Sequence, residues 1–222
     1  MQAIMETLFD AVYLIGVVVL GVLMLKGGKK REHRLFGLMA VILGLGDSFH
    51  LVPRAIALCT TGLEAHAAAL GAGKFITSIT MTVFYVLLYH VYCLRYGKKE
   101  KNVTLSIYAL AAVRVLLCLL PQNDWLAYRQ PLAFGILRNV PFALLGGLII
   151  YLFYKETRAK GDRVFRHMAL AITLSFALYI PVVLFSGVFP PVGVLMIPKT
   201  LAYVWIVIMG YQDMRRAVRS ES

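Results

Sequence analysis

The sequence predicts an all-α, polytopic membrane protein that folds as a single domain over residues 1–222, with seven transmembrane helices in one bundle. Hydrophobic residues are 60% of the chain and charged residues only 15%, and the mean hydropathy is +0.76. A soluble domain is typically about half apolar and about a quarter charged. The apolar residues also fall into seven stretches of roughly 20, the length that crosses a bilayer, with positive charges clustered between them. This composition excludes a water-soluble enzyme, a disordered tail and a disulfide-stapled secreted domain.

Each expected span ends where charge, polarity or proline interrupts the apolar run. The first three cover about 5–25, 35–58 and 67–95, and they are followed by KGGKKREHR, TTGLEAH and GKKEKN. The next two cover about 103–120 and 131–154, followed by PQNDW and KETRAKGDR. The last two, about 168–189 and 192–211, are separated by the Pro190–Pro191 pair. The third span is longer than a bilayer needs, so we expect it to tilt or to project past the interface.

The lysines and arginines predict the orientation of the bundle. Seventeen of the 23 lie after the first, third and fifth spans and in the tail, while the opposite loops hold only Arg129. Cytoplasmic loops of membrane proteins carry such an excess. We therefore expect the amino terminus outside and the carboxyl terminus in the cytoplasm, in a multi-pass protein of the plasma membrane. The net charge of +12 is then mostly a topology signal, with attraction to anionic lipids as a by-product, and it predicts no nucleic-acid partner.

Ionisable side chains inside the spans indicate a functional site. Seven of them are expected in the outer half of the membrane: Asp10, Asp47, Arg54, Lys74, Arg114, Arg138 and Lys199. Each such charge costs about 2.5–3.5 kcal/mol on insertion scales, so it usually faces the bundle interior or a wet cavity. Lysine and arginine near a helix end can also extend to the interface. Asp47 is too short to do so, and it lies near the membrane midplane.

The helical phase of these residues predicts that they converge. Asp47, His50 and Arg54 follow one stripe of the second span, Lys74 shares a face with Tyr85, and Lys199 lies one turn before Tyr203. We expect a pocket that opens outward and is lined by Arg54, Lys74, Arg114, Arg138, Lys199, Tyr85 and Tyr203. Its excess of cations favours an anionic lipid or a small anion, because arginine matches phosphate and carboxylate geometry. The alternative is that these residues form no pocket: the charges make structural ion pairs, and the tyrosines only fill the core.

Two other chemistries fit the sequence less well. A catalytic zinc ion needs about three convergent ligands, and only one of the five histidines, His50, lies in the charged layer. A retinal-type pigment resembles this chain in having a lysine in its seventh helix, here Lys199, but it also has a carboxylate on the third helix, and the third span holds none. We therefore expect no metal and no cofactor. The three cysteines lack metal-ligand spacing and are expected as free thiols, with a Cys59–Cys118 disulfide near the outer face as the alternative.

The stretch LGDSFHLVPR over residues 45–54 carries a Leu-Gly-Asp motif followed by Leu-x-Pro. It resembles the signature of the YhhN-like lysoplasmalogenase family, and the aromatic-rich end of the third span is similar too, so the resemblance covers about residues 40–95. Members are multi-helix membrane hydrolases that cleave the vinyl-ether bond of lysoplasmalogens. The resemblance implies a catalytic role for Asp47. The family also has a second functional aspartate in a late helix, where the last three expected spans hold none, and generally one more helix. Either the catalysis is rebuilt around Asp10 or His50, or this chain is a relative that has lost or changed the reaction.

Two hypotheses follow. The first is an integral membrane hydrolase of an anionic amphipathic lipid, with lysoplasmalogenase-like cleavage and Asp47 as the general acid or base. Vinyl-ether hydrolysis begins with protonation of a carbon and ends with attack of water on an oxocarbenium ion, which a carboxylate stabilises. The alternative is a non-enzymatic carrier or receptor that binds a small anionic ligand in the same basic pocket.

Overall fold

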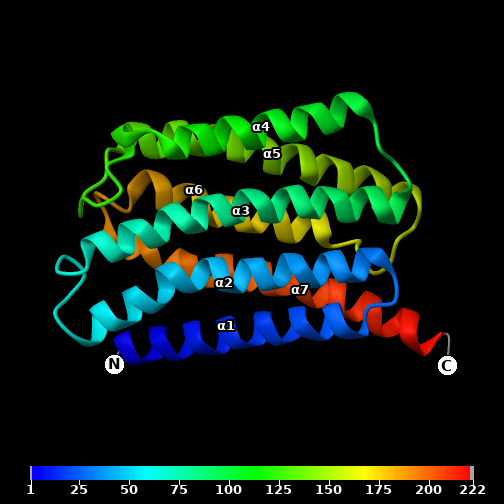
Figure 1. Cartoon of the computed structure of the whole chain (residues 1–222), viewed down its shortest axis with the longest axis horizontal. Coiled ribbons are helices and arrows are strands. Elements are labelled where there is room, and N and C mark those ends of the chain that lie inside the picture. The colour runs from blue at the N-terminus through cyan, green and yellow to red at the C-terminus, as the bar shows by residue number, and fades with distance from the viewer. Residues whose placement is uncertain (1, 221–222) are drawn as a thin grey trace.

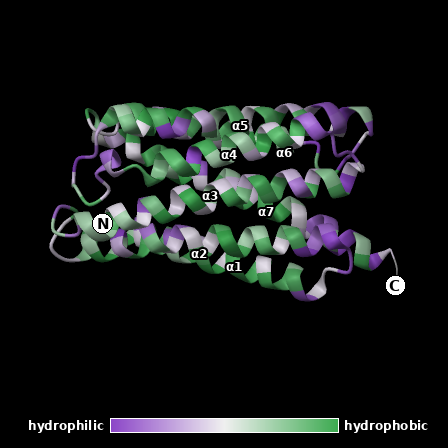
Figure 2. Cartoon of the chain, turned by 45° about the horizontal axis from the view of Figure 1, so that its top comes forward, coloured by the Kyte–Doolittle hydropathy of each residue, from purple (hydrophilic) through white to green (hydrophobic). Residues whose placement is uncertain are grey.

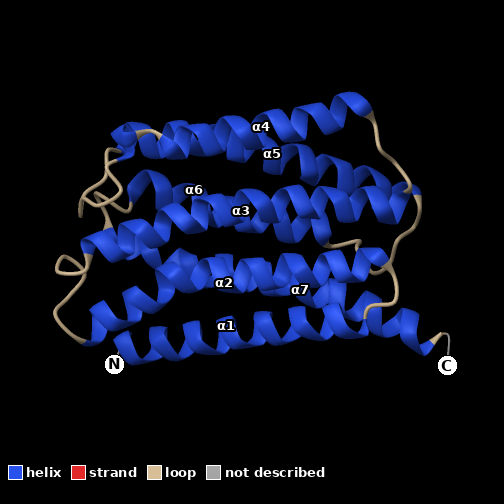
Figure 3. Cartoon of the chain, viewed as in Figure 1, coloured by secondary structure: helices blue, strands red, loops and turns tan. Residues whose placement is uncertain are grey.

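The computed structural model describes residues 2–220, and helices account for most of them (Figure 1). The long helices are α1 (Gln2–Gly27), α2 (Arg31–Cys59), α3 (Ala67–Tyr96), α4 (Lys101–Leu119), α5 (Leu132–Ala159), α6 (Met168–Phe185) and α7 (Met196–Arg219). Two short 3-10 helices, η1 (Pro121–Asn123) and η2 (Pro190–Leu195), lie in the connections before α5 and α7. The part of the chain that is described contains no strand (Figure 3).

All seven long helices are apolar enough to cross a membrane, which confirms the predicted class. In Figure 2 apolar residues cover the sides of the bundle, and hydrophilic residues gather toward its two ends. Large apolar side chains point outward on several helices, among them Ile15, Leu116 and Leu144. Helices satisfy their backbone hydrogen bonds internally, so such a surface suits lipid. The chain is an integral, multi-pass membrane protein.

Each helix packs against the next one in the sequence, and α7 returns to lie against α1 and α2. The helices therefore close into one bundle (Figure 1). The amino terminus and the α2–α3, α4–α5 and α6–α7 connections lie at one end, named here the N end. The carboxyl terminus and the α1–α2, α3–α4 and α5–α6 connections lie at the other, the C end. The positively charged loops are therefore all at the C end.

The helix bounds differ from the expected spans mainly in the second half of the chain. At the C end, α5 continues to Ala159 and α7 to Arg219, beyond their apolar stretches. Lysine, arginine and glutamate are good helix formers, so a helix continues through them after it leaves the apolar region. At the N end, α6 ends early at Phe185 and α7 begins late at Met196. The intervening Pro190–Pro191 pair starts η2, because proline suits the first turn of a helix.

Aromatic side chains fill the centre of the bundle. Tyr85 of α3 is fully buried, and its ring centroid lies 5.1 Å from that of Phe142 on α5 and 5.5 Å from that of Phe176 on α6. Phe84 meets Tyr203 of α7 edge to face at 5.6 Å. Edge-to-face and tilted rings are favoured over face-to-face stacking. These contacts connect α3 to α5, α6 and α7 beside the polar residues of the candidate site.

Candidate functional site

The polar residues predicted from the sequence, together with the polar residues that surround them, divide into two groups by their contacts. The first group, named here the inner cluster, is mostly buried between the helices and consists of Tyr13, Asp47, Tyr85, Arg114, Ser175, Tyr179, Lys199 and Tyr203. The second, named here the rim group, contacts loops, helix ends or other charges and consists of Glu6, Asp10, His50, Arg54, Lys74 and Arg138. Six helices contribute to the inner cluster directly, and α5 contributes through Phe142, which lies under Arg114.

Asp47 joins three helices. The hydroxyl of Tyr13 on α1 donates a 2.6 Å hydrogen bond to Oδ2 of Asp47 on α2. Tyr13 is only 4% exposed, so this bond is largely shielded from the surroundings. Lys199 on α7 is close enough to Asp47 for their opposite charges to attract. Asp47 therefore has one hydroxyl partner and one cationic neighbour, as a carboxylate inside a membrane requires.

Lys199 is held among tyrosines. Its Nζ lies 5.1 Å from the ring centroid of Tyr179 and 5.2 Å from that of Tyr203, within the range of cation–π attraction. The hydroxyl of Tyr203 is 3.3 Å from that of Tyr85, which in turn is 3.3 Å from Oγ of Ser175. A chain of hydroxyls thus runs from beside the ammonium group into the aromatic core.

Arg114 on α4 is the most unusual member of the inner cluster. It is 2% exposed, and its guanidinium carbon lies 3.2 Å from the ring centroid of Phe142. Within residues 2–220, its Nε and Nη1 have no hydrogen-bond partner. A buried donor without a partner costs about 1–3 kcal/mol, and more when it is charged. Such a group calls for an explanation, and a ligand that accepts its hydrogen bonds is one.

The charges of the inner cluster do not cancel. Asp47 opposes two cations, Arg114 and Lys199, which repel each other. The tyrosines and the serine add hydroxyls that donate or accept hydrogen bonds. The arrangement can accept an anion beside the two cations, and it can exchange a proton at the Tyr13–Asp47 pair.

Two arginines of the rim group are engaged away from the inner cluster. Nε of Arg54 donates a 2.5 Å hydrogen bond to Oε1 of Glu6, across the α1–α2 interface. Arg138 on α5 donates from Nη1 to Oδ1 of Asn123 at 2.8 Å, and it lies over the ring of Trp125 at 4.3 Å. The α4–α5 connection therefore holds Arg138.

The other rim residues surround the same end of the bundle. Asp10 is buried on α1, and it lies near enough to Asp47 and Glu6 for their negative charges to repel it. Nδ1 of His50 is 3.3 Å from the carbonyl oxygen of Leu70 on α3. Lys74 is exposed, with Arg54 and Arg138 as its charged neighbours. The rim group is mixed in charge near α1 and basic toward α3 and α5.

The structure brings together only part of the predicted lining. Asp47, Arg114, Lys199, Tyr85 and Tyr203 lie near one another, whereas the rim cations face Glu6, the α4–α5 connection or the surface. Two cavities lie at the C end and neither is lined by these residues, so the outward-opening pocket stays a prediction.

Tyr13 is a site residue that was not predicted from the sequence. Its signal was its position one turn after Asp10 on an otherwise apolar helix. The three cysteines are free thiols, as expected.

A second polar network ties the helices together at the C end. Nε and Nη2 of Arg95 on α3 donate to the two carboxylate oxygens of Asp162 at 2.5 and 3.1 Å, and its Nη1 donates to Asp213 on α7 at 2.9 Å. Nε2 of His33 on α2 lies 3.0 Å from the same oxygen of Asp213. Because α5 and α7 continue past the apolar stretches, these charges meet on helices and beside the α5–α6 connection.

The charge of Arg95 dominates the chemistry of this network. Burial raises the pKa of Asp162, but the hydrogen bonds and charge of Arg95, with smaller contributions from Phe165 N–H and the Tyr96 hydroxyl, bring it below its ordinary value of 3.8. Glu32, His33 and Asp213 offer ligand atoms within 4.8 Å of one another, a set that could hold a metal ion. Nη1 of Arg95 already lies 3.9 Å from Glu32 and 2.9 Å from Asp213, so these carboxylates have a cation beside them.

Comparison of the chain with protein-family models, curated proteins and solved structures gives no match. The inner cluster must therefore be interpreted from its own residues.

Proposed function

We propose that this protein binds the anionic headgroup of an amphipathic lipid, with the inner cluster as the binding site. The observation that carries the proposal is Arg114, a buried guanidinium with two nitrogens, Nε and Nη1, that lack hydrogen-bond partners among the described residues. Lys199 adds a second cation, and Asp47 offsets only one of the two. A phosphate or carboxylate would accept the unused hydrogen bonds and relieve the repulsion between the two cations.

The proposal includes an orientation. The excess of lysine and arginine at the C end favours a cytoplasmic C end and an outward N end, in the plasma membrane. The ligand would then enter from the outer leaflet, where Lys74 and Arg54 attract its headgroup on the way to Arg114. Its single chain would lie along the apolar flanks of the helices.

Ligand selectivity tests this binding function. We expect palmitoyl lysophosphatidate to raise the melting temperature of the purified protein in neutral detergent, and palmitoyl monoacylglycerol, which has the same chain without phosphate, to leave it unchanged. Lys199→Gln should weaken the effect, because it removes a cation beside the headgroup. Arg129→Gln, an exposed change at the same end, is the matched control. Equal shifts from the two lipids would contradict the proposal.

A second candidate function is hydrolysis of a vinyl-ether lysolipid, favoured by the position of Asp10 near Asp47. This pair would stand in for the late aspartate of the YhhN-like family. In this reaction Asp47 donates a proton to the alkenyl carbon, and water adds to the oxocarbenium carbon. The resulting hemiacetal releases the chain as an aldehyde and leaves a free glycerol hydroxyl on the chain-free glycerophosphate diester. His50 lies one helical turn further along α2, in position to act as the base for the water.

Aldehyde release from a 1-alkenyl lysophospholipid separates the two functions. If the protein is a hydrolase, aldehyde accumulates and Asp47→Asn abolishes it. Asp124→Asn, in the exposed α4–α5 connection, should have no effect. Saturable binding of the same lipid without aldehyde would favour a carrier or receptor and would contradict the hydrolase.

A further inference from the structure

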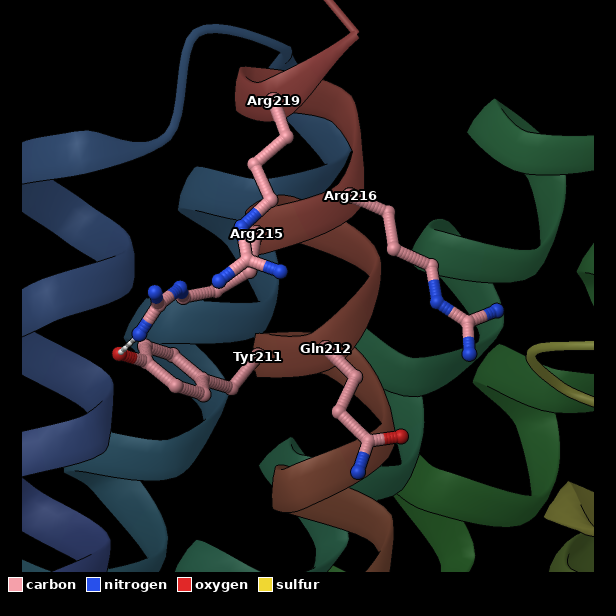
Figure 4. A pocket seen from close by; sticks show the side chains of 5 residues that line it. All are labelled: Tyr211, Gln212, Arg215, Arg216 and Arg219. Carbon is pink, nitrogen blue, oxygen red and sulfur yellow. Dashed lines mark hydrogen bonds between the residues drawn. The ribbon is translucent and has the colours of Figure 1, made fainter.

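A cavity of about 480 Å³ opens at the C end between α1 and α7. Its wall contains the apolar side chains Leu23, Met214 and Val218, and the polar ones Lys26, Tyr211, Arg215 and Arg219. An adjoining cavity of about 290 Å³ shares three of these residues and extends onto the other side of α7 (Figure 4). The wall of the larger cavity thus combines apolar and basic side chains from both helices.

Among the described residues that line this cavity there is no carboxylate. Figure 4 shows Arg215 reaching back toward Tyr211, where its Nη1 lies 3.4 Å from the phenol oxygen, while Arg216 and Gln212 point the other way. Lys26 is exposed in the last turn of α1 and faces the cavity from the opposite helix. Three cations therefore surround one space.

Several other cations at this end already bind acceptors within the protein. Arg95 contacts Asp162 and Asp213, Nζ of Lys98 donates to Glu156 at 2.7 Å, and Nε of Arg34 donates to the Gly28 carbonyl oxygen at 3.0 Å. Among the described residues, Lys26 and Arg215 face the phenol of Tyr211 and apolar side chains instead. An anion from outside the protein would complete this site.

The outer face of α1 indicates which kind of anion binds at this cavity. Ile15, Val19 and Leu23 are four residues apart, so they form one stripe along the helix, and all three are exposed. The stripe extends about 12 Å from the cavity into the apolar zone, close to half of the roughly 30 Å hydrocarbon thickness. An acyl chain can lie along it while its phosphate stays among the cations.

We propose that the α1–α7 cavity binds the phosphate of an anionic phospholipid in the leaflet that borders the C end. Lys26 and Arg215 contact the phosphate oxygens, Tyr211 lies at the headgroup level, and an acyl chain covers the stripe from Leu23 to Ile15. This site is separate from the inner cluster, and lipid binding here does not depend on the function of the inner cluster.

Native mass spectrometry of the full chain in neutral detergent tests the proposal, with phosphatidylglycerol and phosphatidylcholine of identical chains as probes. The double variant Lys26→Gln/Arg215→Gln removes two cations of the cavity. Lys155→Gln/Arg158→Gln is the matched control, because both residues lie at the same end on α5 and neither lines the cavity. We expect the wild type and the control to retain phosphatidylglycerol at least about tenfold more than phosphatidylcholine, and the cavity variant to lose this preference.

Equal phosphatidylglycerol retention by the two double variants would overturn the proposal. Displacement of the lipid by inorganic phosphate at equal concentration would also overturn it, since the site would then take a free anion. Lys26 and Arg215 are exposed, so we expect both variants to fold. Their melting temperatures in phosphatidylcholine check this. Lys26→Gln alone is a milder variant, and it should also reduce the preference for phosphatidylglycerol.

Discussion

The hydroxyl of Tyr13 on α1 and the carboxylate of Asp47 on α2 lie 2.6 Å apart, although they are 34 residues apart in the chain. This bond gives a carboxylate within the membrane a neutral partner in addition to its cationic neighbour Lys199. Asp47 offsets only one of the two cations, so one positive charge of the Lys199–Arg114 pair is left for a ligand. The proposed function depends on this division of partners.

Tyr13→Phe removes the bond and leaves the ring in place. A hydrogen bond to a charged group contributes about 1.5–3 kcal/mol, so we expect the free energy of unfolding to fall by about that amount. Denaturant unfolding in detergent measures it. Tyr128→Phe, in the exposed α4–α5 connection, is the control. Equal stability of the two variants would show that the bond contributes nothing to the fold.

Gly73→Ala tests the close approach of α3 to α2. A methyl group at Gly73 would overlap the carbonyl oxygen of Phe49, which is backbone and cannot move aside cheaply. Overpacking of this kind typically costs about 1–3 kcal/mol. Gly147→Ala on α5 meets no atom within 4 Å, so it should be neutral or should stabilise by about 0.5–1 kcal/mol through helix propensity. The melting temperature of Gly73→Ala should therefore fall, and that of Gly147→Ala should stay the same or rise.

The network around Arg95 predicts how stability depends on pH. The pKa of Asp162 is lower in the folded protein than its ordinary 3.8, so the carboxylate stabilises the fold above about pH 4 and this contribution is lost as the pH falls through the folded pKa. Asp162→Asn should be less stable than the wild type at neutral pH, and it should lose less stability between about pH 5 and about pH 3. Parallel stability curves for the two proteins would contradict this assignment.

Composition and charge were enough to predict the seven helices, because a membrane span requires a long apolar run and positive loops mark its ends. Expected depth in the membrane and helical phase together also predicted that charged residues from several helices, among them Asp47, Arg114 and Lys199, would converge. Helix ends were less predictable: α5 and α7 continue into charged segments, where apolar periodicity carries no signal.

The partners of individual polar groups could not be predicted. Arg138 and Asn123 are 15 residues apart, and Arg95 and Asp213 are 118 apart. Which of several possible acceptors a long side chain reaches depends on how the helices rotate and tilt as they pack. Tyr13 was missed because a buried tyrosine on an apolar helix usually serves only as packing, and its pairing with Asp47 also depends on how α1 and α2 pack.

The most direct test of the central claim uses the variant Arg114→Met. Its affinity for palmitoyl lysophosphatidate and its free energy of unfolding are both measured and compared with those of the wild type. Methionine fills a similar apolar space without the buried charge, so we expect the variant to be at least as stable as the wild type. We also expect it to bind the lipid at least about tenfold more weakly, because a charged hydrogen bond contributes roughly 1.5–3 kcal/mol. Arg129→Met should change neither quantity. Unchanged affinity in Arg114→Met, or a large loss of stability, would show that Arg114 supports the fold and does not bind the ligand.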